Sequence, residues 1–140
     1  MKIEFITSVV VITSDLQASR GLFMGALGLP LVPRDREYYA SDDVGGCKHF
    51  GVWPISQAAE ACFGTDTWPD DVPVPQTSIE FEVADAAAVA KGADELRSLG
   101  YRMLHDAKTE PWGQTIARVL SPDGSMVGVS YSPRFHDPQS

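Results

Sequence analysis

The sequence carries two closely matching patterns, each beginning with a serine and reaching an aspartate seven residues later. Residues 8–16 read SVVVITSDL and residues 78–86 read SIEFEVADA, 70 residues further along the chain. In the second copy, Ser78, Glu80 and Glu82 alternate with apolar residues, so they share one face of a strand. A carboxylate shielded on such a face can bind a positive group or act as a general base. Glu80 is therefore the candidate catalytic residue if the protein is an enzyme.

We expect Glu80 to lie deeper on this face than Glu82, which we place near the solvated rim. A buried carboxylate without a partner is costly and tends to be protonated. Arg118, on the strand predicted for residues 114–120, is the candidate partner of Glu80.

Aromatic and polar residues in two other segments could complete a binding site. Trp112 lies in EPWGQ, where the flanking Pro and Gly make strand packing a poor explanation for it, and Gln114 follows closely. In KHFGVW, His49 and Trp53 share one strand face. Pockets for small molecules are commonly apolar and aromatic with a few polar groups. We expect Trp68, in an Asp-rich segment, to anchor that segment at the surface.

Tyr38 and Tyr39 are adjacent in a predicted strand, so only one of them can point to the same side as the other candidates. Which one does so is left open by the sequence.

Serine or cysteine nucleophiles are not indicated. Ser8 and Ser78 have no histidine at an inferable distance, and Cys47 and Cys62 have no adjacent base. The two cysteines form no Cys-x-x-Cys pair, so they are typical of a reduced, cytoplasmic protein.

Composition narrows the class of partner. The chain has 140 residues, of which 44% are hydrophobic and 21% charged, as in one soluble globular domain. Its net charge of −8 argues against a nucleic-acid partner, although it suits a cationic ligand. No apolar run reaches the ~18 residues that a membrane span needs, and the stretch FITSVVVI lacks the features of a signal peptide. We therefore expect no membrane partner.

The elements that carry these residues repeat in the two halves. In the first half, a strand at 3–13 leads into a helix with a capping box, Ser14 at the N-cap and Gln17 at N3, which ends before Gly28. In the second half, a helix that begins at Asp85 follows the strand. The other strands are predicted at 29–32, 36–41, 47–53, 77–83, 101–106, 114–120 and 125–131.

Each half thus reads strand, helix, strand, strand, strand. We predict a single domain over 1–140, which divides into unit 1 (about 3–54), a connector (55–76), unit 2 (about 77–133) and a loose tail (134–140). The connector is long for a compact domain, so we expect it to hold at most one short helix and to cross the surface between the units.

The chain resembles the vicinal oxygen chelate superfamily in three features. These are the two tandem βαβββ units, the opening SDL…LGLPL and the closing EPWGQTIARVLSPDGSMVGVSY. This group includes glyoxalase I, extradiol dioxygenases, fosfomycin resistance proteins and the bleomycin resistance protein. The resemblance covers about residues 3–133. It implies an α+β fold whose sheets form one cupped, partly closed barrel, with helices outside and the ligand on the concave face. It also implies a homodimer.

Metal-using members of this superfamily hold the ion at four symmetric positions, usually with His, Gln or Glu. The resemblance assigns these positions to Ser8, Gly51, Ser78 and Gly128. Glycine offers no side chain, and a neutral serine hydroxyl is a weak ligand beside His or carboxylate. We therefore predict a dismantled metal site, with no metal and no other cofactor.

These observations predict a metal-free protein that binds a small aromatic or cationic molecule, similar to the sequestering bleomycin resistance proteins. Its candidate ligand-binding residues are Ser8, His49, Trp53, Ser78, Glu80, Trp112, Gln114 and Arg118. The alternative is an enzyme of the superfamily: a metal-free isomerase or lyase that uses Glu80 or His49, or a metal-dependent glyoxalase or dioxygenase if the assumed register is wrong. A third reading is a pocket filled by the protein's own side chains.

Overall fold

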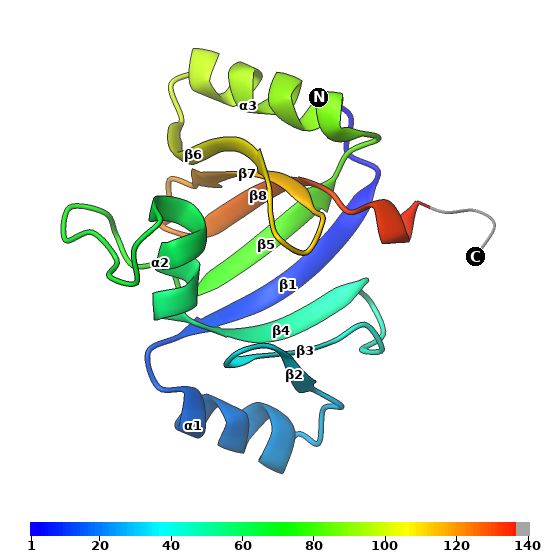
Figure 1. Cartoon of the computed structure of the whole chain (residues 1–140), viewed down its shortest axis with the longest axis vertical. Helices are drawn as coiled ribbons and strands as arrows, with labels where there is room; N and C mark the ends of the chain where they lie inside the picture. The colour runs from blue at the N-terminus through cyan, green and yellow to red at the C-terminus, as the bar shows by residue number, and fades with distance from the viewer. Residues whose placement is uncertain (137–140) are drawn as a thin grey trace.

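Strand-forming segments of both halves join into one curved, open sheet of eight strands, as the computed structural model in Figure 1 shows. The structure describes residues 1–136. The strand order is β2-β3-β4-β1-β5-β8-β7-β6, so the first strands of the two units, β1 and β5, lie side by side at the centre. The strands are β1 (Phe5–Thr13), β2 (Val32–Asp35), β3 (Tyr38–Ser41), β4 (His49–Pro54), β5 (Thr77–Glu82), β6 (Arg102–Thr109), β7 (Thr115–Leu120) and β8 (Met126–Tyr131).

The two units have matching strand registers. In unit 1, the residue two positions after Ser8 pairs with Gly51 across β1 and β4. In unit 2, the residue two positions after Ser78 pairs with Gly128 across β5 and β8. The four positions assigned from the sequence are therefore equivalent in the two units, and the predicted α+β fold of two βαβββ units is confirmed.

The first helix starts one residue later than the capping box indicates. α1 (Leu16–Arg20) has Asp15 as its N-cap, whose Oδ1 accepts from the backbone N–H of Ala18 at 3.1 Å, so the predicted Ser14 cap is wrong. Asp15 has φ −135° and ψ 85°, so its backbone is not yet helical, as is usual for an N-cap residue. α1 runs on as the π-helix η1 (Gly21–Ala26).

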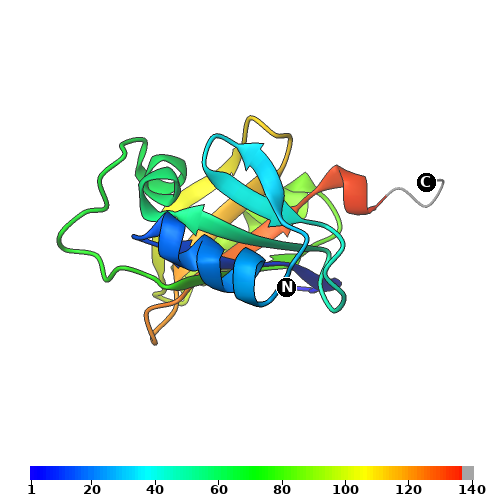
Figure 2. The same cartoon turned by 90° about the horizontal axis from the view of Figure 1, so that it is seen from below.

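The equivalent helix of unit 2, α3 (Ala86–Ser98), begins where predicted. The Asp85 carboxylate accepts from the backbone N–H of Ala88 at 2.8 Å and caps it. α3 packs on the outer face of the sheet through an apolar cluster of Val83, Val89, Ala93, Ala117 and Val129. Figure 1 places α3 and α1 at opposite ends of the sheet, and α1, in blue, lies in the foreground when the molecule is seen from below in Figure 2. No helix within residues 1–136 is long and apolar enough to cross a membrane.

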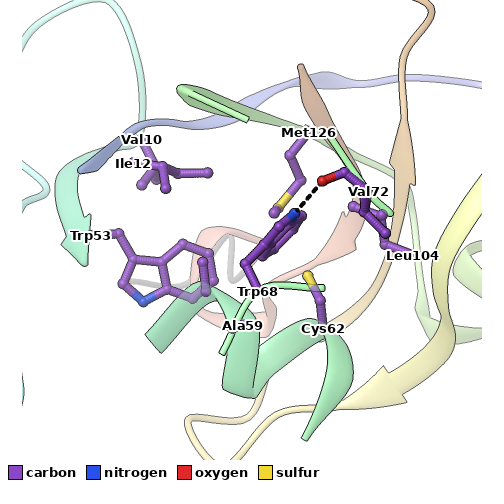
Figure 3. Close-up of a cluster of buried hydrophobic side chains, with 10 residues drawn as sticks. Val10, Ile12, Trp53, Ala59, Cys62, Trp68, Val72, Leu104 and Met126 are labelled. Carbon is purple, nitrogen blue, oxygen red and sulfur yellow. Dashed lines mark hydrogen bonds between the residues drawn. The ribbon is translucent and has the colours of Figure 1, made fainter. Parts of the chain in front are cut away.

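The connector does not merely cross the surface. It contains α2 (Ile55–Phe63), which lies between the two outer helices in Figure 1 and closes one end of the concave face. Small residues at Ala58 and Ala59, both without exposed surface, let this helix approach the sheet closely. The cluster in Figure 3 consists of Val10, Ile12, Trp53, Ala58, Ala59, Cys62, Trp68, Val72, Leu104 and Met126.

Trp68 anchors the connector, as predicted, but from the interior and not from the surface. Only 8% of the residue is exposed. Its indole N–H donates to the carbonyl of Val72 at 3.1 Å, a bond drawn in Figure 3. The ring of Phe63 meets it edge-on with centroids 5.0 Å apart. A large aromatic with a satisfied N–H stabilises a buried position, which explains why the long connector is ordered.

Candidate functional site

A cavity of about 550 Å³ opens on the concave face of the sheet beside α2. Its volume lies within the range of roughly 300–1,000 Å³ typical of small-molecule sites. Seven of the eight predicted ligand-binding residues line it: Ser8, His49, Trp53, Glu80, Trp112, Gln114 and Arg118. Ser78 is fully buried and is not among the lining residues.

One row of cross-strand neighbours runs across six strands at the level of the cavity. Along the row, each residue pairs with the next, in the order His105, Arg118, Gly128, Glu80, Ser8 and His49. Paired residues on neighbouring strands project to the same face of a sheet. Strand pairing therefore brings titratable groups that lie far apart in the sequence onto one face of the sheet.

Glu80 is held by an amide and not by a charge. The residue is 8% exposed, and its Oε1 accepts from Nε2 of Gln114 at 2.9 Å. The same Nε2 donates to Oγ of Ser130 at 2.8 Å, while Oε1 of Gln114 accepts from the indole N–H of Trp112 at 2.8 Å. Because Trp112 can only donate, this chain fixes which end of the amide faces Glu80.

Arg118 does not pair with Glu80, so that prediction is wrong. Strand β8 lies between their strands, which separates the two Cα atoms by two strand spacings, about 10 Å. Arg118 is 1% exposed, and its Nη1 donates to Nε2 of His105 at 3.0 Å. Its guanidinium carbon lies 5.4 Å from the ring centroid of Trp53, and its Nε has no hydrogen-bond partner in the described part of the chain.

The groups beside Arg118 supply no negative charge. Burial, followed by the Arg118 charge, lowers the pKa of His105 to about 4, so the ring is neutral at neutral pH. Its Nδ1 donates to the carbonyl of Asp106 at 2.6 Å, which leaves Nε2 as the acceptor for Arg118. Burial raises the pKa of the Cys62 thiol, despite the opposing charge of Arg118, and keeps it protonated.

A second hydrogen-bonded chain lies on the other wall. Tyr38 lines the cavity and Tyr39 does not, which answers the question left open by the sequence. The Tyr38 hydroxyl lies 2.6 Å from Nε2 of His49, whose Nδ1 lies 2.6 Å from Oδ1 of Asp42. Asp42 also pairs with Arg134. Since the carboxylate accepts the Nδ1–H, Nε2 accepts the tyrosine proton, and the tyrosine oxygen keeps lone pairs for a donor in the cavity.

The charges in this chain are set by its surroundings. Burial and then the nearby Glu80 charge raise the pKa of Tyr38 well above its ordinary value, so the phenol stays protonated. Partial burial acts to raise the pKa of Asp42, but the hydrogen bond from His49 and the charge of Arg134 together hold it below the usual value.

The two glycines at the presumed metal positions have no room for a side chain. A Cβ on Gly51 would lie 2.6 Å from ring carbons of Tyr38. A Cβ on Gly128 would lie 2.9 Å from Cδ1 of Ile116 and 3.0 Å from Cγ of Glu80. Other side chains therefore fill the space that two metal ligands would need.

The remaining two positions, Ser8 and Ser78, carry buried hydroxyls with no hydrogen-bond partner among residues 1–136. In the same part of the chain, no group of three or more His, Cys, Asp or Glu side chains is arranged to hold a metal ion. Two hydroxyls and two glycines do not fit a divalent cation of the kind that His and carboxylate ligands hold.

Glu82 is fully buried, so its predicted place at the solvated rim is wrong. Its carboxylate accepts from Oγ1 of Thr7 at 2.6 Å, the backbone N–H of Ser132 at 2.5 Å and Nε2 of His136 at 2.7 Å. Phe5 is the residue paired with Glu82, and a register shift between Ile6 and Ser8 falls at Thr7. Ser132 and His136 of the C-terminal segment also contact the carboxylate.

The tail predicted to be loose is ordered in the described part. It forms the short 3-10 helix η2 (Pro133–Phe135), and Arg134 pairs with Asp42. Residues 137–140 of the predicted tail lie outside the described residues.

Sequence reasoning missed several lining residues from β1, β2 and the C-terminal segment: Thr7, Val10, Arg34, Asp35, Ser132, Pro133, Arg134 and Phe135. Three arginines and two acids line the cavity, namely Arg34, Arg118, Arg134, Asp35 and Glu80. The charges RDRE at 34–37 were the one visible signal. The lining thus gathers positive charge in a chain whose net charge is −8.

Comparisons with known proteins agree with this architecture. The sequence profile of the Glyoxalase/Bleomycin resistance protein/Dioxygenase superfamily matches residues 5–129. The chain belongs to this superfamily. The resemblance inferred from the two βαβββ units is thereby confirmed. No curated protein sequence matches the chain.

Solved structures share the superfamily fold at low identity. A superfamily member from Vibrio splendidus 12B01 is 13% identical, with a TM-score of 0.58 over 94% of this chain and 100% of that one. Streptomyces coelicolor methylmalonyl-CoA epimerase is 16% identical, with a TM-score of 0.56 over 94% and 99%. A protein from Legionella pneumophila described as an NAD-dependent benzaldehyde dehydrogenase is 10% identical, with a TM-score of 0.58 over 89% and 96%. These likenesses show the fold of the superfamily and assign no activity.

Proposed function

We propose that this superfamily member binds a small organic molecule in the cavity without the help of a metal ion. The observation that carries the proposal is a pair of buried polar atoms, Oγ of Ser8 and Nε of Arg118, on two residues that line the cavity. Neither atom has a hydrogen-bond partner among the described residues. Native proteins pair nearly all such atoms, and leaving one unpaired costs about 1–3 kcal/mol. A ligand with matching polar atoms recovers that cost.

Aromatic residues in the wall support a ligand with a flat apolar part. Trp53 and Tyr38 lie in the interior with their rings edge-on and their centroids 6.1 Å apart. Trp112 is 53% exposed, although its N–H is fixed to Gln114. An exposed tryptophan held in place beside a cavity offers a stacking surface at low entropic cost.

A thermal-shift screen of small aromatic compounds, run with and without a chelator, tests this proposal. We expect hits whose stabilisation is unchanged by the chelator, and protein purified without added metal to hold far less than one equivalent of metal by elemental analysis. One tightly held metal per chain, or hits that vanish with the chelator, would show that binding depends on a metal.

The second candidate is a metal-independent enzyme that uses Glu80 as a general base. The observation in its favour is orientation, because Oε1 is fixed by Gln114 while Oε2 has no donor among residues 1–136. The fold shared with methylmalonyl-CoA epimerase makes an enzyme of the superfamily an equally reasonable class. The Glu80→Gln variant separates the two candidates. Lost turnover with retained ligand affinity indicates catalysis, whereas a loss of affinity alone indicates a binding protein.

The expected homodimer and the cytoplasmic location stay part of this proposal. Light scattering after size exclusion tests the first. A mass of twice 15.2 kDa supports the dimer, and a mass of 15.2 kDa contradicts it.

A further inference from the structure

We propose that the inner end of the cavity is a carboxylate site built on Arg118, so that the ligand is an organic acid. The inference rests on the proposed small-molecule function and names the chemical class of its ligand. It also revises the sequence-based expectation, since it keeps an aromatic ligand body but replaces a cationic group with an anionic one.

Arg118 carries a charge that no acid of residues 1–136 balances by direct pairing. A guanidinium does not lose its proton in proteins, so burial leaves the full charge in place. Other arginines pair with acids, namely Arg36, Arg97, Arg102 and Arg134. No carboxylate of residues 1–136 lies within ion-pairing distance of Arg118. A buried charge of this kind strongly favours a counter-ion from the ligand.

The guanidinium is also held in position. Its Nη1 donates to Nε2 of His105, and its central carbon lies over the ring of Trp53 in a cation–π arrangement. Together these contacts restrict rotation of the guanidinium. The edge that carries Nε is left without a partner. A planar carboxylate accepts two parallel N–H groups from such an edge, which gives both direction and charge pairing.

The rest of the row sets limits on the ligand. Glu80 lies one strand beyond Gly128 on the same face, so a second negative group on the ligand would be repelled there. Ser8, the next neighbour, offers a hydroxyl that lacks a partner. The row therefore suits a monoanion with its acid group on Arg118 and a hydrogen-bond donor directed to Glu80. A cationic ligand group at the inner end would instead face the guanidinium.

Calorimetric titration with three compounds of one shape and different charge tests the inference. Benzoate, benzamide and benzylamine are compared on the wild-type protein and on Arg118→Gln. Arg118→Lys keeps the positive charge but lacks the two parallel N–H groups of the guanidinium. It provides a second test of the site if Arg118→Gln folds poorly. Arg102→Gln is the matched control, because Arg102 is an exposed arginine paired with Asp71 and does not line the cavity.

We expect wild type and Arg102→Gln to bind benzoate at least tenfold more tightly than benzamide, and benzylamine more weakly still. Arg118→Gln should lose the preference for benzoate, and Arg118→Lys should retain only part of it. If benzamide or benzylamine binds wild type as well as benzoate does, the carboxylate site is refuted while the small-molecule function stands. If Arg118→Gln keeps the preference, Arg118 is not the site. If none of the three binds, the inference fails, and a compound screen that also finds nothing overturns the proposed function with it.

Discussion

Replacing the buried carboxylate of Glu82 by the Glu82→Ala substitution should strongly destabilise the protein. This side chain has no exposed surface and accepts three hydrogen bonds, from Thr7, from the backbone N–H of Ser132 and from His136. It thereby joins the central strands to the C-terminal segment. The alanine variant leaves buried donors without an acceptor and opens a small void.

The size of the effect follows from these contacts. A hydrogen bond to a charged group contributes roughly 1.5–3 kcal/mol. Water that enters the void satisfies part of what is lost, so the three bonds together should amount to about 3–5 kcal/mol, the range found when one partner of a buried charged pair is removed. For a domain of this size, 1 kcal/mol corresponds to about 3 °C in Tm. The Tm should therefore fall by about 9–15 °C.

Denaturant and thermal unfolding of Glu82→Ala, with Glu4→Ala as the control, measure this effect. Glu4 is an exposed acid that lies just before β1. Because Pro133, Arg134 and Phe135 line the cavity, the same variant should also weaken ligand binding. A Tm within the error of the control would mean that the Glu82 contacts do not hold the C-terminal segment.

Three further outcomes are expected. Gly51→Ala should lower the free energy of unfolding by about 1–3 kcal/mol, because the new Cβ forces the Tyr38 ring aside. Gly45→Ala, the control, has open space around its Cβ and should lower it far less. Equal unfolding curves for the two variants would contradict this. The free energy of unfolding should decrease as the pH falls from about 6.5 to about 4, because the unfolded chain protonates His105 in a range where the folded protein does not. His105→Gln should remove that part of the pH dependence, and an unchanged pH profile would speak against it. Because Trp53 and Trp112 both line the cavity, Trp112→Phe should reduce the ligand-induced change in tryptophan fluorescence, and Trp68→Phe should leave it unchanged. The reverse result would place the ligand elsewhere.

The repeat in the sequence, together with the superfamily resemblance that it supports, predicted the fold and much of the cavity lining. Alternation alone placed Ser78, Glu80 and Glu82 on one face, and the aspartate seven residues after each serine marks the true helix caps, Asp15 and Asp85. These features are local, since a strand period or a cap depends on residues that are neighbours in the chain.

The errors concern contacts between distant segments. Arg118 was expected to reach Glu80 because hydrophobic periodicity does not give strand order, and β8 with Gly128 lies between them. Glu82 was expected at the rim because nothing in its own strand reveals that residues 132–136 fold back over it. The connector was expected to cross the surface, but its helix α2 packs into the core. Its alanines do not reveal this in the sequence, because they pack against strands that lie far from them in the chain.

The side-chain Nε–H resonances of the protein labelled with ¹⁵N-arginine test the central claim most directly. The signal of Arg118, assigned by its absence from Arg118→Gln, reports on a buried guanidinium nitrogen that has no hydrogen-bond partner among residues 1–136. We expect this signal to shift on addition of benzoate and to remain in place on addition of benzamide, while the signal of Arg102 responds to neither. An Arg118 signal that does not move with benzoate under saturating conditions, or that moves equally with benzamide, would contradict a carboxylate site on Arg118.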